Sequence, residues 1–151
     1  METGILLLSR RAHSRAELQQ KLVRRGYEPD AVAATLTRVT ELGYLDDAAF
    51  ARGLVRRRSS SRGPMALAAE LSSKGIDRAG AAVALAGFDP DAQLVAATRL
   101  AERLGARRTD EGYRELLDRI GPKLMRRGFS SGVVRAACRA AWLGKGGEAE
   151  P

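Results

Sequence analysis

The chain has 151 residues, which is long enough to bury a core of its own. Aromatic residues are 5% of it, and alanine and leucine dominate its apolar share, so the composition favours closely packed small helices over a sheet. Its 26 basic residues exceed its 18 acidic ones and give a formal net charge of +8. The expected partner is therefore acidic, either nucleic acid or an acidic protein surface, rather than a membrane.

The start of the chain does not resemble an export signal. Residues 5–8 form an apolar run that is too short to span a bilayer, and this run precedes Arg10 and Arg11. An export signal has the opposite order, with its basic residues before the apolar run. We therefore expect a cytoplasmic protein.

The sequence offers little for catalysis or for cofactor and metal binding. It contains neither a Walker-type loop nor a paired-cysteine motif, so we expect no enzyme activity, no cofactor and no metal. The single cysteine, Cys138, lies four residues after Val134 on a helix face and is predicted to fill a core. His13 is the only histidine and is predicted to lie on the surface.

The first half of the chain shows clear helix boundaries. We expect a first helix over residues 4–12, and then Ser14 as the N-cap of a second helix, with Glu17 completing a capping box. This second helix ends at Gly26, because glycine accepts the left-handed backbone that satisfies the last carbonyls. Proline at position 29 suits the first turn of a third helix.

Further caps and glycines predict helices along the rest of the chain. The expected start signals are Asp46 with Asp47, Gly63 with Pro64, Asp77, Asp89 with Pro90, and Ser130 or Ser131. Two acidic pairs, Asp46 with Asp47 and Asp89 with Asp91, lie where helices begin and are interpreted as caps rather than as catalytic carboxylates, and Glu17 is interpreted as a cap too.

From Tyr113 onward the apolar residues again have helical spacing, and Gly121 and Pro122 interrupt this pattern. Proline inside a helix removes a hydrogen bond, so we expect either a kink at Pro122 or a new helix that starts there.

The helix expected over residues 91–104 has a predicted buried face of Leu94, Ala97, Ala101 and Leu104.

A short phrase recurs at intervals of about fifty residues: a leucine, then basic residues, then a glycine four after the leucine, then an apolar residue. Its copies end at Tyr27, Ile76 and Phe129. Such repetition is typical of a tandem helical array. We predict an all-α fold of three tandem three-helix repeats in an elongated, curved array, with repeats at residues 1–45, 46–88 and 89–144 and a disordered tail at 145–151.

The charge is concentrated toward the two ends. Residues 1–62 carry a net charge of +5, residues 63–105 carry −1, and residues 106–151 carry +4. Each single arginine is explained by solvation of a helix face, but the clusters together exceed what solubility requires. The predicted partner-binding residues are Arg24, Arg25, Arg56, Arg57, Arg58, Arg62, Arg107, Arg108, Arg126 and Arg127.

Several stretches, in their order and spacing, resemble the RecX family, the bacterial regulators of the RecA recombinase. The stretches are residues 13–18 (HSRAEL), 25–27 (RGY), 43–51 (GYLDDAAFA), 62–64 (RGP), 74–76 (KGI) and 126–129 (RRGF). The similarity extends from about residue 5 to residue 142. Two features depart from it, namely the Gly121–Pro122 interruption and the alanine-rich, weakly charged middle.

The resemblance implies a non-enzymatic, all-helical regulator that is mainly an inhibitor of RecA. It would bind RecA filaments on DNA and limit filament extension, strand exchange, ATP hydrolysis and coprotease activity, and so modulate DNA repair and the SOS response. We expect a monomer. The aromatic residues expected to hold the repeats together are Tyr27, Tyr44, Phe50, Phe88, Phe129 and Trp142.

Two other functions fit the sequence. A basic helical protein can bind single- or double-stranded DNA without sequence preference, in which case its affinity depends strongly on salt. A general helical adaptor, whose charge is incidental, also fits the repeats. The sequence shows no helix with base-reading side chains along one face, so specific recognition of a DNA sequence is not expected.

Overall fold

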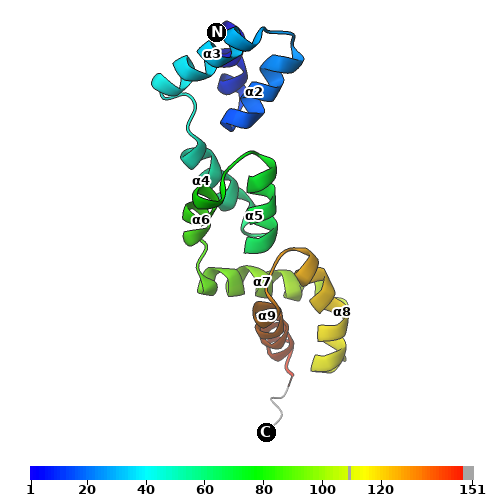
Figure 1. Cartoon of the computed structure of the whole chain (residues 1–151). Coiled ribbons are helices and arrows are strands. Elements are labelled where there is room, and N and C mark those ends of the chain that lie inside the picture. The colour runs from blue at the N-terminus through cyan, green and yellow to red at the C-terminus, as the bar shows by residue number, and fades with distance from the viewer. Residues whose placement is uncertain (109, 148–151) are drawn as a thin grey trace. The chain divides into compact units, whose positions relative to one another are not determined.

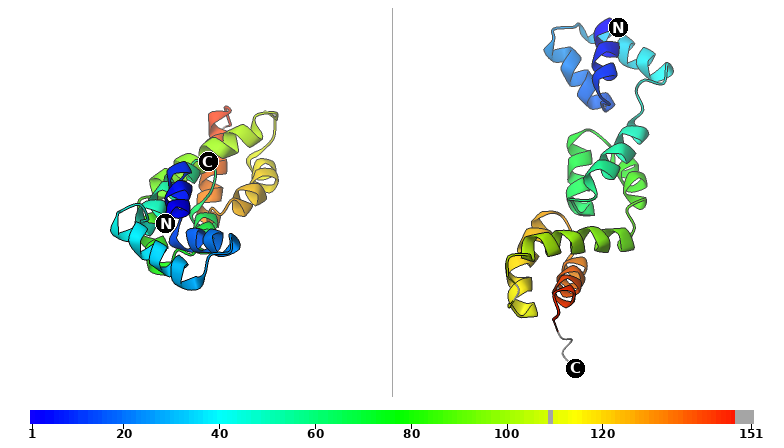
Figure 2. Two further views of the ribbon diagram at one scale, coloured as in Figure 1. Left: turned by 90° about the horizontal axis from the view of Figure 1, so that it is seen from above. Right: turned by 180° about the vertical axis from the view of Figure 1, so that it is seen from behind.

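The computed structural model describes residues 1–108 and 110–147. These residues form nine α-helices and no strand, which confirms the predicted all-α fold (Figures 1 and 2). The helices are α1 (Glu2–Arg10), α2 (Arg15–Arg24), α3 (Pro29–Glu41), α4 (Asp47–Arg58), α5 (Pro64–Ser73), α6 (Arg78–Ala86), α7 (Pro90–Gly105), α8 (Tyr113–Arg126) and α9 (Ser131–Gly144).

Short polar side chains begin five of these helices as predicted, and each accepts a hydrogen bond from an amide in the first turn. The acceptor and donor pairs are Ser14 with Glu17 (3.1 Å), Asp46 with Ala49 (3.1 Å), Asp77 with Gly80 (2.7 Å), Asp89 with Ala92 (2.8 Å) and Ser130 with Val133 (3.4 Å). Ser130, rather than Ser131, is therefore the cap of α9.

Two acidic residues that we interpret as caps from the sequence, Asp47 and Glu17, do not cap their own helices. Asp47 accepts a hydrogen bond from the amide of Arg15 at 2.7 Å, so it satisfies a first-turn amide of α2, whose N-cap is Ser14, and none of α4. The Glu17 carboxylate forms ion pairs with Arg11 (2.9 Å) and Lys74 (3.2 Å). Burial acts to raise the pKa of Glu17, but these cations outweigh it and hold the pKa below its ordinary value.

The recurring phrase is a helix-ending motif with a defined hydrogen bond. In each copy the amide of the apolar residue after the glycine donates to the carbonyl of the leucine, which is the bond of a Schellman motif. These bonds run from Tyr27 to Leu22 (3.3 Å), from Ile76 to Leu71 (3.0 Å) and from Phe129 to Leu124 (3.3 Å). We call residues 24–27, 74–76 and 126–129 the first, second and third glycine turn.

The chain divides into two compact units, and the division passes through the segment expected to be the middle repeat. Unit 1 comprises Met1–Leu54 and Glu70–Ala84, and unit 2 comprises Val55–Ala69 and Leu85–Pro151. The division into three repeats at residues 1–45, 46–88 and 89–144, and the elongated array, stay predictions.

In unit 1, helices α1, α2 and α3 pack on one another (Figure 1). Apolar residues three or four apart on α2 and α3 supply most of the core, as the helical period requires, and α1 and the segment after α3 add one residue each. The buried residues of this core are Leu7, Leu18, Leu22, Val32, Leu36, Val39 and Leu45.

In unit 2, helix α9 packs against both α7 and α8. The predicted face of α7 is partly wrong, because Leu94 and Leu104 are only half-buried while Ala96 and Leu100 are buried beside Ala97. Alanine at the contacts lets the helix axes approach closely. Cys138 lies in this core as predicted, and burial raises the pKa of its thiol to about 11.

Pro122 lies inside α8, which continues without a new start to Arg126. The predicted restart is therefore wrong. Gly121 and Leu124 on either side of the proline are buried, whereas Pro122 itself is exposed. Tertiary contacts of the buried face thus compensate for the hydrogen bond that a proline removes.

Two predictions about exposure are also wrong. The side chain of His13 is 3% exposed, and it bonds to the Arg11 carbonyl (2.9 Å) and to Lys21 (2.8 Å). Tyr27 and Tyr44 were expected to hold repeats together, but they are 42% and 58% exposed. The other aromatics in that set, Phe50, Phe88 and Phe129, are buried, and Trp142 is half-buried.

Candidate functional site

Unit 2 contains an open cleft of about 610 Å³ that is lined mainly by cations. Its charged residues come from two separate parts of the chain, the segment before α5 and the C-terminal end of α8. The lining residues are Arg62, Ala66, Leu104, Lys123, Arg126 and Arg127. We call this the cationic cleft.

Backbone contacts bring the two parts of the cleft together. The Gly63 amide donates to the Arg127 carbonyl at 2.7 Å, and the Met65 amide donates to the Gly128 carbonyl at 3.1 Å. The guanidinium of Arg127 also donates to the Ser61 carbonyl at 3.2 Å. The third glycine turn is thereby fixed against the start of α5, so Arg62 and Arg127 line one space.

The six described residues that line the cleft include four cations and no carboxylate. All four cationic side chains are exposed. Guanidinium groups present a planar fork of donors that matches phosphate and carboxylate oxygens. The cleft is therefore suited to binding a polyanion.

The structure brings together three of the ten predicted site arginines, namely Arg62, Arg126 and Arg127. All ten are exposed, and eight lie in unit 2. Outside the cleft lining, residues 56–58 form the last turn of α4, Arg107 and Arg108 follow α7, and Arg24 and Arg25 lie in unit 1 at the end of α2.

Sequence reasoning missed Lys123. It was not part of an arginine cluster, but it stands four residues before Arg127 on the same helical path. Residues at this spacing share one face of a helix. The four-residue spacing from Arg127 could therefore have identified Lys123 from the sequence.

Two charged networks elsewhere are internal to their units. In unit 2, Glu111 is buried and bonds to Arg119, with Nε of the arginine 3.0 Å from the carboxylate, and these bonds hold the pKa of Glu111 below its ordinary value. Lys145 donates to the Gly105 carbonyl, so the residue expected to begin a disordered tail is held by contacts. Residues 148–151 of that tail lie outside the described residues.

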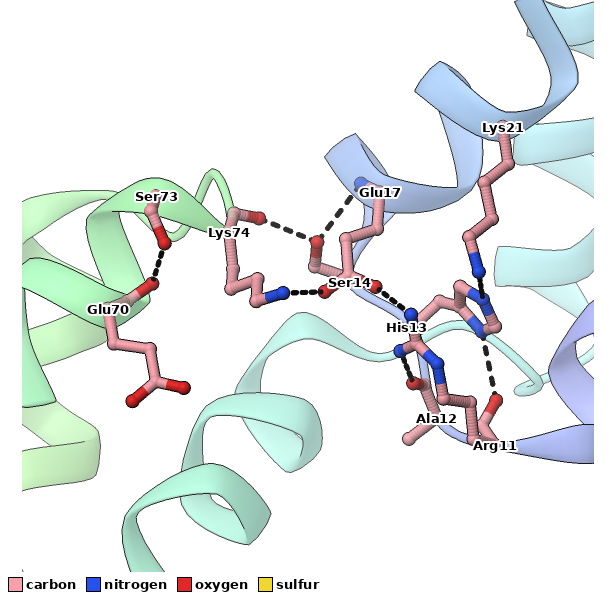
Figure 3. A network of polar contacts seen from close by, with 9 residues as sticks. All are labelled: Arg11, Ala12, His13, Ser14, Glu17, Lys21, Glu70, Ser73 and Lys74. Carbon is pink, nitrogen blue, oxygen red and sulfur yellow. Dashed lines mark hydrogen bonds and ion pairs between the residues drawn. The ribbon is translucent and has the colours of Figure 1, made fainter. Parts of the chain in front are cut away.

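In unit 1, a polar network joins the segment before α2 to the second glycine turn (Figure 3). The Ser14 hydroxyl donates to the Lys74 carbonyl at 2.6 Å, and Glu17 pairs with the Lys74 ammonium. Arg11 and His13 lie beside them. Every charged group in this network has a structural partner. We therefore interpret the network as a structural contact that holds the segment before α2 against the second glycine turn.

The part of the chain that the structure describes contains no cluster of three or more potential metal ligands. Within the same residues, no helix has the length and apolarity that a membrane span requires.

Comparisons with known proteins agree on one family. The model of the RecX first three-helix domain matches residues 1–38, and the model of the second three-helix domain matches residues 46–85. Regulatory protein RecX from Xanthomonas axonopodis pv. citri is 41% identical over 142 residues, covering 92% of this chain and 85% of that protein. RecX from Mycolicibacterium vanbaalenii is 39% identical over 132 residues, covering 82% of this chain and 72% of the relative.

Solved structures give the same result. The crystal structure of RecX from Lactobacillus salivarius superposes with a TM-score of 0.84 at 26% identity, covering 94% of both chains. A second crystal structure of a regulatory protein RecX gives a TM-score of 0.78 at 26% identity, covering 87% of this chain and 67% of the other. Sequence and structure together show that this chain belongs to the RecX family of regulatory proteins.

Proposed function

We propose that the protein regulates the RecA recombinase, mainly as an inhibitor, by binding RecA filaments on DNA. Binding limits filament extension, strand exchange, ATP hydrolysis and coprotease activity, and so modulates DNA repair and the SOS response. The protein acts in the cytoplasm by binding, without catalysis and without a cofactor. Membership of the RecX family supports this function.

The cationic cleft is the proposed contact with the filament. A RecA filament on DNA carries phosphates and acidic side chains, and a cleft with four cations and no carboxylate among its described lining residues suits either group. The remaining predicted arginines, at positions 24, 25, 56–58, 107 and 108, are proposed to add weaker contacts. Several weak contacts held in one molecule bind more tightly than each alone.

A second candidate function is non-specific DNA binding without RecA. The same cleft supports it, because phosphate contacts need cations in an open groove and do not need base-reading side chains. The two functions differ in stoichiometry. A filament regulator acts at a small fraction of the RecA concentration, whereas a DNA binder acts only when it covers the DNA.

The test measures ATP hydrolysis by RecA on single-stranded DNA while this protein is added at substoichiometric amounts. Binding to the same DNA without RecA is measured at the same salt concentration. We expect inhibition well below the concentration that saturates the DNA. Inhibition that begins only when the DNA is coated would contradict the proposal and favour the second function.

A pair of variants tests the cleft itself. Lys123→Gln with Arg126→Gln removes two exposed charges from the cleft. We expect the concentration for half-inhibition to rise by about tenfold, because two exposed ion pairs at about 0.2–1 kcal/mol each are together worth on the order of 1.4 kcal/mol. Arg52→Gln with Arg99→Gln is the matched control, because it removes two exposed helical arginines that do not line the cleft. Equal effects of the two variants would contradict the role of the cleft.

A further inference from the structure

A lysine amine and a histidine ring form a direct contact in unit 1. The Nζ atom of Lys21, on α2, lies 2.8 Å from Nε2 of His13, in the segment before α2 (Figure 3). The other ring nitrogen, Nδ1, bonds to the Arg11 carbonyl. Because His13 is the only histidine and both of its nitrogens have partners, no other lysine of the chain shares this arrangement.

The imidazole is oriented to take a proton from Lys21. Nδ1 lies 2.9 Å from the Arg11 carbonyl oxygen, which only accepts, so Nδ1 carries the ring proton. Nε2 is therefore the acceptor of the ring, and it faces the lysine. A neutral Lys21 amine can donate one N–H to Nε2 and keep its lone pair for reaction.

The two groups differ in their access to solvent. His13 is 3% exposed, so packing holds its ring in place, whereas Lys21 is half-buried and stays open to a small reagent. A nucleophile with a base within hydrogen-bond reach, itself oriented by a third group, is the usual arrangement of an activated nucleophile. Here the third group is the Arg11 carbonyl.

The charges around Lys21 favour its neutral form. The pKa of Lys21 is lowered, first by burial and then by nearby cations, while one carboxylate opposes the shift. The cations are Arg11, Arg25 and Lys74, and the carboxylate is Glu17. A lower pKa leaves more of the neutral amine, which is the nucleophilic form. The same cations attract a reagent that carries a phosphate group.

The chain contains three other lysines, whose settings differ from that of Lys21. Lys74 and Lys145 are held by contacts, the first by an ion pair at 3.2 Å and the second by a bond to a backbone carbonyl. Lys123 is exposed in the cationic cleft, which attracts the same anions. Lys123 therefore shares the accessible, cationic setting of Lys21 but has no imidazole beside it, so it serves as an internal reference.

We propose that Lys21 is an acylation site for acyl phosphates, with His13 as the base. The neutral amine attacks the carbonyl carbon, so a C–N bond forms. The C–O bond to the phosphate breaks, and inorganic phosphate leaves with the electron pair of that bond. Nε2 of His13 takes the proton that the nitrogen loses and passes it on to water.

The acylated product is compatible with the same contact. Its amide nitrogen keeps one N–H, which can donate to Nε2 of His13, so the fold is retained. Helix α2 loses one positive charge four residues before Arg25, which is a predicted partner-binding residue on the same helical path. Acylation therefore lowers the charge of this surface without unfolding unit 1. The proposal does not depend on the RecA proposal.

The test treats the full chain with acetyl phosphate and measures the initial rate of acetylation at each lysine by mass spectrometry of its peptides. We expect Lys21 to react at least about tenfold faster than Lys123, which is less than the roughly hundredfold or more that a base supplies in an enzyme, because the reagent is not held in place. In urea that unfolds the chain, the two rates should become similar. Similar rates in the folded chain would overturn the proposal, and so would a Lys21 excess that persists in urea.

A variant separates a base from a mere hydrogen-bond acceptor. His13→Gln keeps an acceptor for the Lys21 amine but supplies no base, so the Lys21 rate should fall toward that of Lys123. The Arg52→Gln, Arg99→Gln variant leaves the groups around Lys21 intact and should keep the full rate. Circular dichroism should show unaltered helix content in both variants. A folded His13→Gln protein that still acetylates rapidly at Lys21 would overturn the role of His13.

Discussion

At the scale of single residues, the clearest departure from expectation is His13. Its Nδ1 lies 2.9 Å from the Arg11 carbonyl, and its Nε2 lies 2.8 Å from the Lys21 ammonium. A carbonyl accepts and an ammonium donates, so Nδ1 carries the proton and the imidazole is neutral. Burial lowers the pKa of His13, and the neighbouring cations Arg11 and Lys21 act in the same direction. No local pattern indicates this burial, because the contacts depend on how the segment before α2 folds back.

This lowered pKa predicts a pH dependence of stability. The unfolded chain binds a proton on His13 as the pH falls through the ordinary value of 6.5, while the folded chain binds it only at lower pH. The free energy of unfolding should therefore decrease as the pH falls from about 7.5 to about 5.5. Urea unfolding at both values measures this change. His13→Gln should reduce the pH dependence, and an unchanged dependence in that variant would show that other groups cause it.

At the scale of elements, the glycine turns do two things. Each ends a helix with a Schellman bond, and this function follows from local sequence. The second and third turns also make close backbone contacts with the start of another helix, whereas the first turn reaches the start of α1 through the Tyr27 hydroxyl, 2.6 Å from that of Thr3. Nothing in the local phrase predicts this difference. Only the positions of the partner helices decide which turns are covered.

The difference between turns can be measured by adding one methyl group. Gly26→Ala and Gly128→Ala both place a side chain at positive φ, +87° and +94°, and this strain costs about 1–2 kcal/mol. At Gly128 the new Cβ would also lie 2.3 Å from a backbone nitrogen, whereas at Gly26 it would meet nothing within 4 Å. We expect Gly128→Ala to lower the free energy of unfolding by clearly more than Gly26→Ala, as measured in urea. Equal losses would show that the contact between the third glycine turn and the start of α5 relaxes without a cost in stability.

At the scale of the whole molecule, the charge is uneven. Residues 1–62 and 106–151 carry +5 and +4, while the middle carries −1. Unit 2 contains the cationic cleft and eight of the ten predicted arginines. Any affinity for DNA should therefore come mainly from unit 2 and should have the salt dependence of phosphate contacts.

The salt dependence can be assigned to the cleft. For single-stranded DNA, the logarithm of the binding constant falls with the logarithm of salt concentration by about 0.7 for each phosphate contacted. The Lys123→Gln, Arg126→Gln variant should therefore have a slope that is smaller by about 1.4, as measured by fluorescence anisotropy at several salt concentrations. The Arg52→Gln, Arg99→Gln variant should keep the slope of the unaltered protein. A cleft variant with an unchanged slope would place the phosphate contacts elsewhere.

Local chemistry alone determined much of this protein. Capping residues, glycines that accept positive φ and the 3.6-residue period act within a few residues of chain, so the sequence predicted the helices, the repeated phrase and the buried Cys138. The tertiary structure decided what depends on residues far apart. Arg127 and Ser61 are separated by 66 positions, and only folding brings the two halves of the cationic cleft together. The burial of His13 and the passage of α8 through Pro122 were decided in the same way, because packing across helices outweighed the local preference.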